Sequence, residues 1–232
     1  MKQKILTAVR VAAIFLFSYN NPVFAQSETP KFEVGAQFTL LSVNPHSVIC
    51  FDICLIGSDR RYTELGVGVR FTYNITNNIG LEAEGNLFPR DYSSYNLQLL
   101  GLGGRNSQGQ FGFKIGKRFR RLGVFGKIRP GFVSFSKVSY VVSRSVITFD
   151  FGSQYTVGQF GERRRRFFSI DAGGVVEFYP SKHLMTRVDL GDTIIQYGSI
   201  YVPGYSLSNA IRKIEPETRH NFQFSVGLGL RF

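Results

Sequence analysis

The sequence lacks tryptophan and long apolar runs, and it is poor in cysteine and histidine. Among 232 residues there are no Trp, 2 Cys, 2 Met and 3 His. After residue 25, no apolar stretch approaches the roughly 20 residues that a membrane-spanning helix needs, which excludes a helical membrane protein. The three histidines are His46, His183 and His220, and no glycine-rich loop precedes a helix. We therefore expect no enzyme activity, no cofactor and no metal site.

The first 25 residues have the pattern of a cleaved secretory signal peptide. Three basic residues accompany a short apolar stretch at 11–17, and Val23-Phe24-Ala25 places a small residue at the expected cut. The apolar stretch is too short to span a bilayer. Gln26 would follow the cut, so a lipid anchor is not indicated. We expect residues 1–25 to be removed and residues 26–232 to form one exported domain.

The strongly basic composition points to a membrane surface. The formal net charge is +12, and the bases are spread over the whole exported chain. Anionic lipid headgroups are the expected partner, and nucleic acid is not. The mean hydropathy of −0.04 resembles that of soluble proteins. Such averages conceal membrane β-barrels, because half of each strand faces inward.

The segment 221–232 alternates strictly between apolar and polar or small residues. Its apolar residues are Phe222, Phe224, Val226, Leu228, Leu230 and Phe232. Since side chains alternate across a strand, one face is wholly apolar and uncharged, which favours a lipid-facing strand over a soluble edge strand. The segment resembles the closing strand of bacterial outer-membrane β-barrels. This resemblance implies that Phe232 is the assembly signal read by the barrel assembly machinery.

Seven further segments alternate in a similar way. We expect strands at 31–41, 62–73, 79–87, 108–118, 124–135, 167–179, 184–197 and 221–232. Long and short connections alternate, and the long ones are 42–61, 88–107, 136–166 and 198–220. An even strand count with the long loops at one end predicts an all-β, closed antiparallel, eight-stranded transmembrane β-barrel. The strand-prone residues 137–151 leave two alternatives, a hairpin standing above the membrane or a ten-stranded barrel.

Two positions break the alternation. Strict alternation over 184–197 would place Asp192 in lipid, at a cost of up to a few kcal/mol near the midplane. We therefore expect a β-bulge at Gly191-Asp192 that resets the phase. The bulge would turn three residues outward, namely Thr193, Ile195 and Tyr197. Pro130 has no N–H, so its strand should contain a bulge or a skipped ladder bond.

The polar faces of the strands carry charges of both signs. The bases that we place in the lumen are Lys31, Arg70, Lys114, Lys127, Arg129, Arg187 and Arg231, and the acids are Glu33, Glu82, Glu84, Asp171, Glu177 and Asp189. An eight-stranded barrel has room inside only for side chains, and buried charges persist only when they are paired. We expect a salt-bridged plug. The alternative is a narrow ion path or a proton-sensitive gate.

The two cysteines lie close together in the first long loop. Cys50 and Cys54 are separated by three residues, and an exported pair of this kind predicts a disulfide. A metal site that includes His46 is the alternative, but it lacks a fourth ligand.

Four consecutive bases, Arg163, Arg164, Arg165 and Arg166, directly precede the aromatic pair Phe167-Phe168. This position corresponds to the outer headgroup level of the predicted barrel. Arginine binds phosphates through charge-assisted, bidentate hydrogen bonds, so the run favours contact with lipopolysaccharide phosphates. The alternative is a solvated loop end.

The mature chain as a whole resembles the small OmpA- and OmpX-like outer-membrane barrels, in its signal peptide, strand count, loop order and terminal Phe232. The resemblance implies an integral outer-membrane protein. The order of long and short connections places both termini in the periplasm, and we expect a monomer. The resemblance also implies a role in membrane integrity, adhesion or surface interaction. A small channel is one alternative. A lipid A hydrolase at the outer rim, using His220 with an acid such as Glu217 and a serine, is another.

Overall fold

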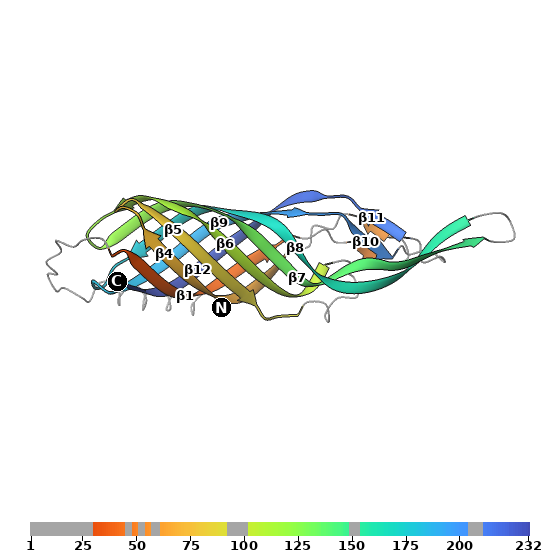
Figure 1. Cartoon of the computed structure of the whole chain (residues 1–232), viewed down its shortest axis with the longest axis horizontal. Helices are drawn as coiled ribbons and strands as arrows, with labels where there is room; N and C mark the ends of the chain where they lie inside the picture. Colours follow the sequence, from red (N-terminus) through yellow and green to blue (C-terminus); the bar gives the residue numbers. More distant parts are fainter. Residues whose placement is uncertain are drawn as a thin grey trace, which may run out of the picture.

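Eight strands form one closed antiparallel barrel (Figure 1). The structure is a computed structural model that describes residues 30–44, 48–50, 54–56, 61–91, 102–148, 154–203 and 211–232. The barrel strands are β1 (Phe32–Val43), β4 (Tyr62–Asn74), β5 (Ile79–Phe88), β6 (Leu102–Arg118), β7 (Leu122–Thr148), β8 (Gln154–Phe178), β9 (Leu184–Tyr197) and β12 (Glu217–Arg231). Each strand pairs with its neighbours in the chain, and β12 closes the barrel against β1. The predicted eight-stranded closed fold is confirmed, and the ten-stranded alternative is wrong.

Two small hairpins stand outside the barrel sheet. The first is formed by β2 (Val48–Cys50) and β3 (Cys54–Ile56) in the connection from β1 to β4. The second is formed by β10 (Ile200–Pro203) and β11 (Ile211–Ile214) in the connection from β9 to β12. The long connections therefore carry structure of their own.

The barrel has a turn end and a loop end. The turn end holds three short turns, at 75–78, 119–121 and 179–183, together with the first and last residues of the barrel. There the N–H of Phe32 donates to the carbonyl of Phe232 (3.2 Å), and the N–H of Phe232 donates to the carbonyl of Phe32 (2.9 Å). The loop end holds the long connections, so the predicted sorting of long and short connections is confirmed.

β7 and β8 continue beyond the barrel as a two-stranded ribbon (Figure 1). Their pairing extends to Thr148 opposite Gln154, with register shifts after Phe135 and Val141. The expected hairpin continuous with these two strands is thus confirmed, whereas the expectation of a loop over 136–166 is wrong. The strand-prone residues of this segment pair with each other and do not add strands to the barrel.

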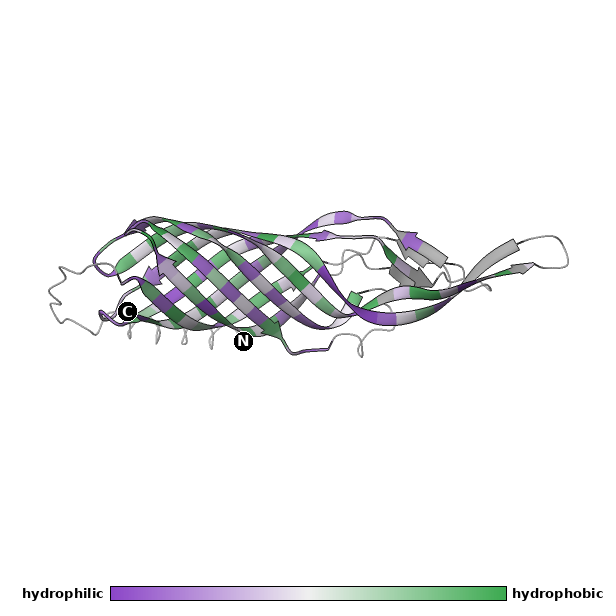
Figure 2. Ribbon diagram, viewed as in Figure 1, coloured by the Kyte–Doolittle hydropathy of each residue, from purple (hydrophilic) through white to green (hydrophobic). Residues whose placement is uncertain are grey.

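The barrel wall alternates between exposed apolar and buried polar residues (Figure 2). Phe38, Val69 and Leu228 are 67%, 66% and 60% exposed, and they share the outward face with most of the large apolar residues predicted there. In the described part of the chain, no helix is long and apolar enough to cross a membrane. A largely apolar wall around a polar interior reverses the arrangement of a soluble protein and is the arrangement expected of a barrel that hydrocarbon surrounds.

β9 keeps its phase throughout, contrary to the predicted bulge. Its register with β8 and β12 is continuous across Gly191 and Asp192. Thr193, Ile195 and Tyr197 are consequently buried inside the barrel and do not face outward. Asp192 stays on the outer face, where its carboxylate contacts His220 of β12 at 2.5 Å. This contact, close to the loop end, makes a phase reset unnecessary.

Pro130 interrupts the pairing of β7 with β6, as predicted. The paired residues run from Gln110 opposite Gly131 to Phe113 opposite Ile128, and the two positions between them are skipped without any change of register. On its other side Pro130 pairs normally with Ile170 of β8. The missing N–H therefore costs ladder bonds on one side only.

Candidate functional sites: the closed lumen and the basic ribbon

The predicted lumen charges lie inside the barrel, with one exception. Twelve of them are buried, namely Glu33, Arg70, Glu82, Glu84, Lys114, Lys127, Arg129, Asp171, Glu177, Arg187, Asp189 and Arg231. The exception is Lys31, whose side chain is exposed because it lies before β1 begins. Its assignment to the lumen is wrong. Arg118, at the end of β6, takes part instead and contacts Glu33 at 3.1 Å and Glu177 at 3.6 Å.

Arg129 on β7 joins three carboxylates from two directions. Its Nη1 contacts Glu84 at 2.5 Å and Glu82 at 3.4 Å, and its Nη2 contacts Asp171 at 2.6 Å. All four side chains are 0% exposed. Lys127 lies two residues earlier on the same face and contacts Asp171 at 2.8 Å. Because strands alternate, these two bases of β7 necessarily point into the same part of the lumen.

A second group of ion pairs is centred on Arg187 and Lys114. Arg187 binds Glu82 through both Nη atoms, and its Nε contacts Asp189 at 2.9 Å. Lys114 contacts Glu177 at 2.5 Å and Glu33 at 3.0 Å. Since Glu82 also faces Arg129, the two groups form one continuous network across the lumen. Burial of ions is tolerated when each has a partner of opposite sign, and every charge named in these two groups has at least one.

Above the ions lies a layer of neutral amides and hydroxyls that the sequence did not reveal. Gln37 Nε2 donates to Asn86 Oδ1 (2.9 Å), and Asn86 Nδ2 donates to Gln108 Oε1 (2.9 Å). Gln108 Nε2 then donates to Gln223 Oε1 (2.9 Å), which also accepts the hydroxyl of Thr193 (2.7 Å). This chain of hydrogen bonds crosses the lumen from one side of the barrel to the other. The amides therefore fill the part of the lumen that the charged side chains do not occupy.

An apolar layer closes the lumen at the loop end. Its buried residues are Leu41, Val43, Phe88, Leu102, Val133, Phe135, Val138, Phe167, Ile195, Tyr197 and Ile200. Phe135, Phe167 and Tyr197 pack their rings together, with centroids 5.3–6.1 Å apart. One carboxylate, Glu64, is buried at this level and accepts a hydrogen bond from Asn106 Nδ2 at 2.5 Å. Ions, amides and apolar side chains thus fill the described lumen in three layers.

The four arginines of the run lie within β8, beyond the lipid-facing band, and alternate across the strand. Arg164 and Arg166 are exposed and share the outward face with Phe168. Arg165 turns the other way, stacks on Phe167 (5.2 Å) and donates to the carbonyl of Ser199 (2.6 Å). Partial burial and the neighbouring Arg163 guanidinium lower the pKa of Arg165. The run is therefore a crowded cationic patch with two outward members, not four equivalent loop residues.

The cysteines face each other in the β2–β3 pair. The backbone register sets Cys50 directly opposite Cys54, a relation that matches the short Cα separation a disulfide requires. Their side chains lie outside the described part of the structure, so the disulfide stays a prediction. His46, proposed as an alternative metal ligand, lies outside the described residues too, as does the signal peptide.

His220 lies on the outer face, beside an acid other than the one that we expected. Its Nδ1 contacts Asp192 Oδ2, and the backbone N–H of Asn221 donates to Asp192 Oδ1 (3.0 Å). Glu217 instead contacts Arg219 at 2.7 Å. Among the described residues, no serine hydrogen-bonds to His220. A His–Asp pair is therefore present at the loop end, without the nucleophile of a triad in contact with it.

A closed antiparallel barrel of eight strands, apolar outside and filled with polar side chains inside, is a β-barrel of the outer-membrane type. Comparison with solved structures gives the same fold. OprG from Pseudomonas aeruginosa is 12% identical over 88% of this chain and 97% of its own, with a TM-score of 0.53. Neisserial surface protein A is 10% identical over 89% and 100%, with a TM-score of 0.47. Ail of Yersinia pestis, solved with the heparin analogue sucrose octasulfate, is 12% identical over 87% and 99%, with a TM-score of 0.42.

No protein-family model and no curated protein sequence matches the chain. The closed eight-stranded barrel and the likeness to OprG together give the chain the fold of the small bacterial outer-membrane β-barrels.

Proposed function

We propose that this protein is a non-enzymatic integral protein of the bacterial outer membrane, in which a sealed barrel holds a basic ribbon against the phosphates of lipopolysaccharide. The turn end, with both ends of the barrel, faces the periplasm, and the ribbon stands at the outer surface. The observation that carries the proposal is the position of Arg164 and Arg166. Both are exposed and outward-facing, directly beyond the lipid-facing Phe168.

Two further observations support an anionic partner. Arg163 stacks on Tyr140 (4.9 Å) and Arg166 lies over the ring of Phe132 (5.4 Å), so aromatic side chains hold these guanidinium groups in place while leaving edges free to bind oxygen. Burial, together with the neighbouring Arg163 guanidinium, lowers the pKa of Arg165, and a bound anion would offset the repulsion between the two cations. The paired N–H groups of an arginine guanidinium match two phosphate oxygens in geometry as well as in charge.

The layered lumen supports a structural barrel over the alternative of a channel. Conduction requires a continuous polar path, and the apolar layer around Phe135 and Tyr197 interrupts it at the loop end. Purified protein in planar bilayers should show no stable single-channel conductance. Stable conductance in the unmodified protein would contradict the sealed lumen while leaving the ribbon's role open to its own test.

The headgroup contact is tested by lipopolysaccharide binding at low salt. Each surface arginine near anionic headgroups contributes ~1 kcal/mol, so replacing Arg164 and Arg166 with Gln should weaken binding roughly thirtyfold. Arg144→Gln, on the same ribbon and stacked on Tyr201 at 5.6 Å, is the matched control. High salt should remove most of the difference. Unchanged binding in the double variant would show that the arginines are only a solvated part of the ribbon.

A second candidate, a lipid hydrolase at the rim, rests on the contact between His220 and Asp192 alone. A hydrolase requires that the unmodified protein release fatty acid from lipid A and that His220→Gln abolish the release. We expect no release from the unmodified protein.

A further inference from the structure

We propose that a groove in the lipid-facing wall of the barrel binds an acyl chain of the same phosphorylated lipid whose headgroup meets Arg166. The inference rests on the proposed headgroup contact and adds a second, apolar half to that site. The groove crosses β4, β5, β6 and β7 and has a volume of about 650 Å³. This volume lies within the range of roughly 300–1,000 Å³ typical of sites for small molecules.

Three small residues make the floor of the groove. Ala83 and Gly85 on β5 and Gly109 on β6 all face outward, where the rest of the wall carries large apolar side chains. Gly85 pairs directly with Gly109 across the sheet, and the ring of Phe132 covers Gly109, so the open depression lies over Ala83 and Gly85 and ends at Phe132. A Cβ added to Gly85 would meet no atom within 4 Å, which shows that this space is open.

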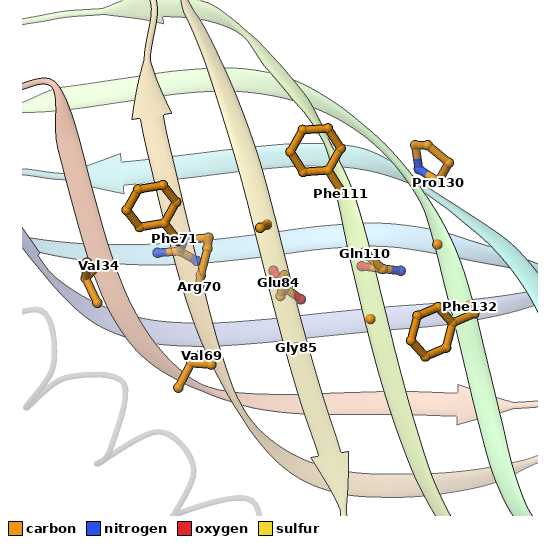
Figure 3. Close-up of a pocket in the computed structure, with 13 residues that line it drawn as sticks. Val34, Val69, Arg70, Phe71, Glu84, Gly85, Gln110, Phe111, Pro130 and Phe132 are labelled. Carbon is orange, nitrogen blue, oxygen red and sulfur yellow. The ribbon is translucent and has the colours of Figure 1, made fainter.

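Aromatic and apolar residues rise on both sides of the floor (Figure 3). Phe71, Phe111 and Pro130 lie on one side, and Val69 and Phe132 lie on the other. The cross-strand row from Val69 through Gly85 and Gly109 to Phe132 follows the register of four strands. The row crosses three strand spacings of ~4.8 Å, and the side chains of Val69 and Phe132 close its two ends.

Polar residues also border the groove, but their side chains are directed away from it. Arg70, Glu84 and Gln110 belong to the buried face of the wall and point into the barrel (Figure 3). The groove thus presents an apolar surface to hydrocarbon. An acyl chain suits it because close packing of methylenes against aromatic walls gains dispersion energy that a flat wall does not supply.

Phe132 connects the groove to the basic ribbon. Its ring folds over Gly109, so that a Cβ there would lie 2.9 Å from the ring, and it forms one end of the groove. The guanidinium of Arg166 lies over the same ring, 5.4 Å from its centroid. A ligand that fills the groove and reaches past Phe132 therefore meets a cation at the headgroup level. The chemistry that fits both parts is a phosphorylated amphiphile with long acyl chains, and we commit to the lipid A portion of lipopolysaccharide as the occupant.

The test compares filled and unfilled grooves. Gly85→Phe places a ring in the open space of the floor. Gly126→Phe is the matched control, because Gly126 is also an outward glycine whose added Cβ meets nothing closer than 3.8 Å, and it does not line the groove. Arg166→Gln removes the headgroup contact. Heat-dependent migration on gels shows that each variant forms a folded barrel before it is assayed.

Native mass spectrometry then measures binding of three probes, namely diphosphorylated lipid A, lipid A without its phosphates, and the deacylated phosphorylated disaccharide. Gly85→Phe should weaken binding of lipid A about tenfold, equivalent to ~1.4 kcal/mol, and leave the deacylated disaccharide unaffected. Gly126→Phe should change neither. Arg166→Gln should weaken both phosphorylated probes.

The possible failures are distinguishable. If Gly85→Phe binds lipid A as well as the unmodified protein does, or if Gly126→Phe loses as much affinity, the groove proposal is overturned while the headgroup contact stands. If the unmodified protein binds the lipid without phosphates as tightly as lipid A, and Arg166→Gln changes nothing, the proposed function itself fails.

Discussion

Replacing Arg129 with methionine should destabilise the barrel more than replacing its carboxylate partner Glu84 with glutamine. Arg129 is the only cation that contacts Glu84 within the described residues, at 2.5 Å. Glu84 would keep only neutral partners, the amides of Asn86 (2.8 Å) and Gln223 (3.5 Å). A buried charge left without its partner costs ~3–5 kcal/mol, and we expect this loss in the free energy of unfolding.

The reciprocal change, Glu84→Gln, should lower the free energy of unfolding by a smaller amount. In Glu84→Gln, Arg129 keeps Asp171, which accepts from both Nη2 (2.6 Å) and Nε (3.0 Å). The loss is then that of one hydrogen bond to a charged group, ~1.5–3 kcal/mol. The double variant carries neither the cation nor the carboxylate, so it should be more stable than Arg129→Met alone.

Urea titration of barrels folded in phospholipid vesicles, followed by circular dichroism, measures all three variants against the unmodified protein. The midpoint should shift with little change in slope, because the unfolded surface is the same. The reasoning is refuted if the double variant is as unstable as the sum of the single variants. That result would mean that Glu84 is not stranded when Arg129 is removed.

Three smaller predictions concern separate parts of the molecule. Thiol titration of oxidised, unfolded protein should find no free thiol if Cys50 and Cys54 are bonded, and two reactive thiols would disprove the bond. His220→Gln should lower the urea midpoint by the equivalent of ~1–3 kcal/mol, because Asp192 on the outer face would keep at most a neutral partner; an unchanged midpoint would show that the contact does not compensate the charge. Gly112→Ala should prevent or strongly weaken folding, since a Cβ there would lie 2.1 Å from a backbone oxygen of β7, whereas Gly126→Ala should be tolerated; equal behaviour of the two would show that the strands readily separate.

Most of the fold could be predicted from the alternation of apolar and polar residues along each strand. Alternation alone placed the outward residues of β1, β4, β5 and β12 and the buried charges, because hydrocarbon outside and a narrow lumen inside reject the wrong side chain. Strand ends were less predictable. Lys31 and Arg118 lie at the turn end, where a side chain can reach water or the lumen, and alternation does not decide between the two.

The apolar layer could not be predicted by the same reasoning. In Phe132-Val133 and Phe167-Phe168 both faces of the strand carry apolar residues. The phase of the strand assigns Phe132 and Phe168 to the outer face, but the pattern does not show that the inward residues pack together in an apolar layer. The error at Asp192 has a related cause. The cost of a charge in lipid was assessed for that residue alone, whereas its partner His220 lies on another strand, 28 residues away.

The ion pairs of the lumen also bear on the order in which the barrel can assemble. Glu33, on the first strand, finds its partners at Lys114, Arg118 and Arg231, and the last is separated from it by 198 residues. An incomplete sheet therefore carries charges that only water can satisfy, which opposes its early collapse or burial in hydrocarbon. These charges are fully neutralised only when β12 pairs with β1. Closure of the barrel should therefore be a late and cooperative step. It should also be slow, because its contacts join residues that are distant in sequence.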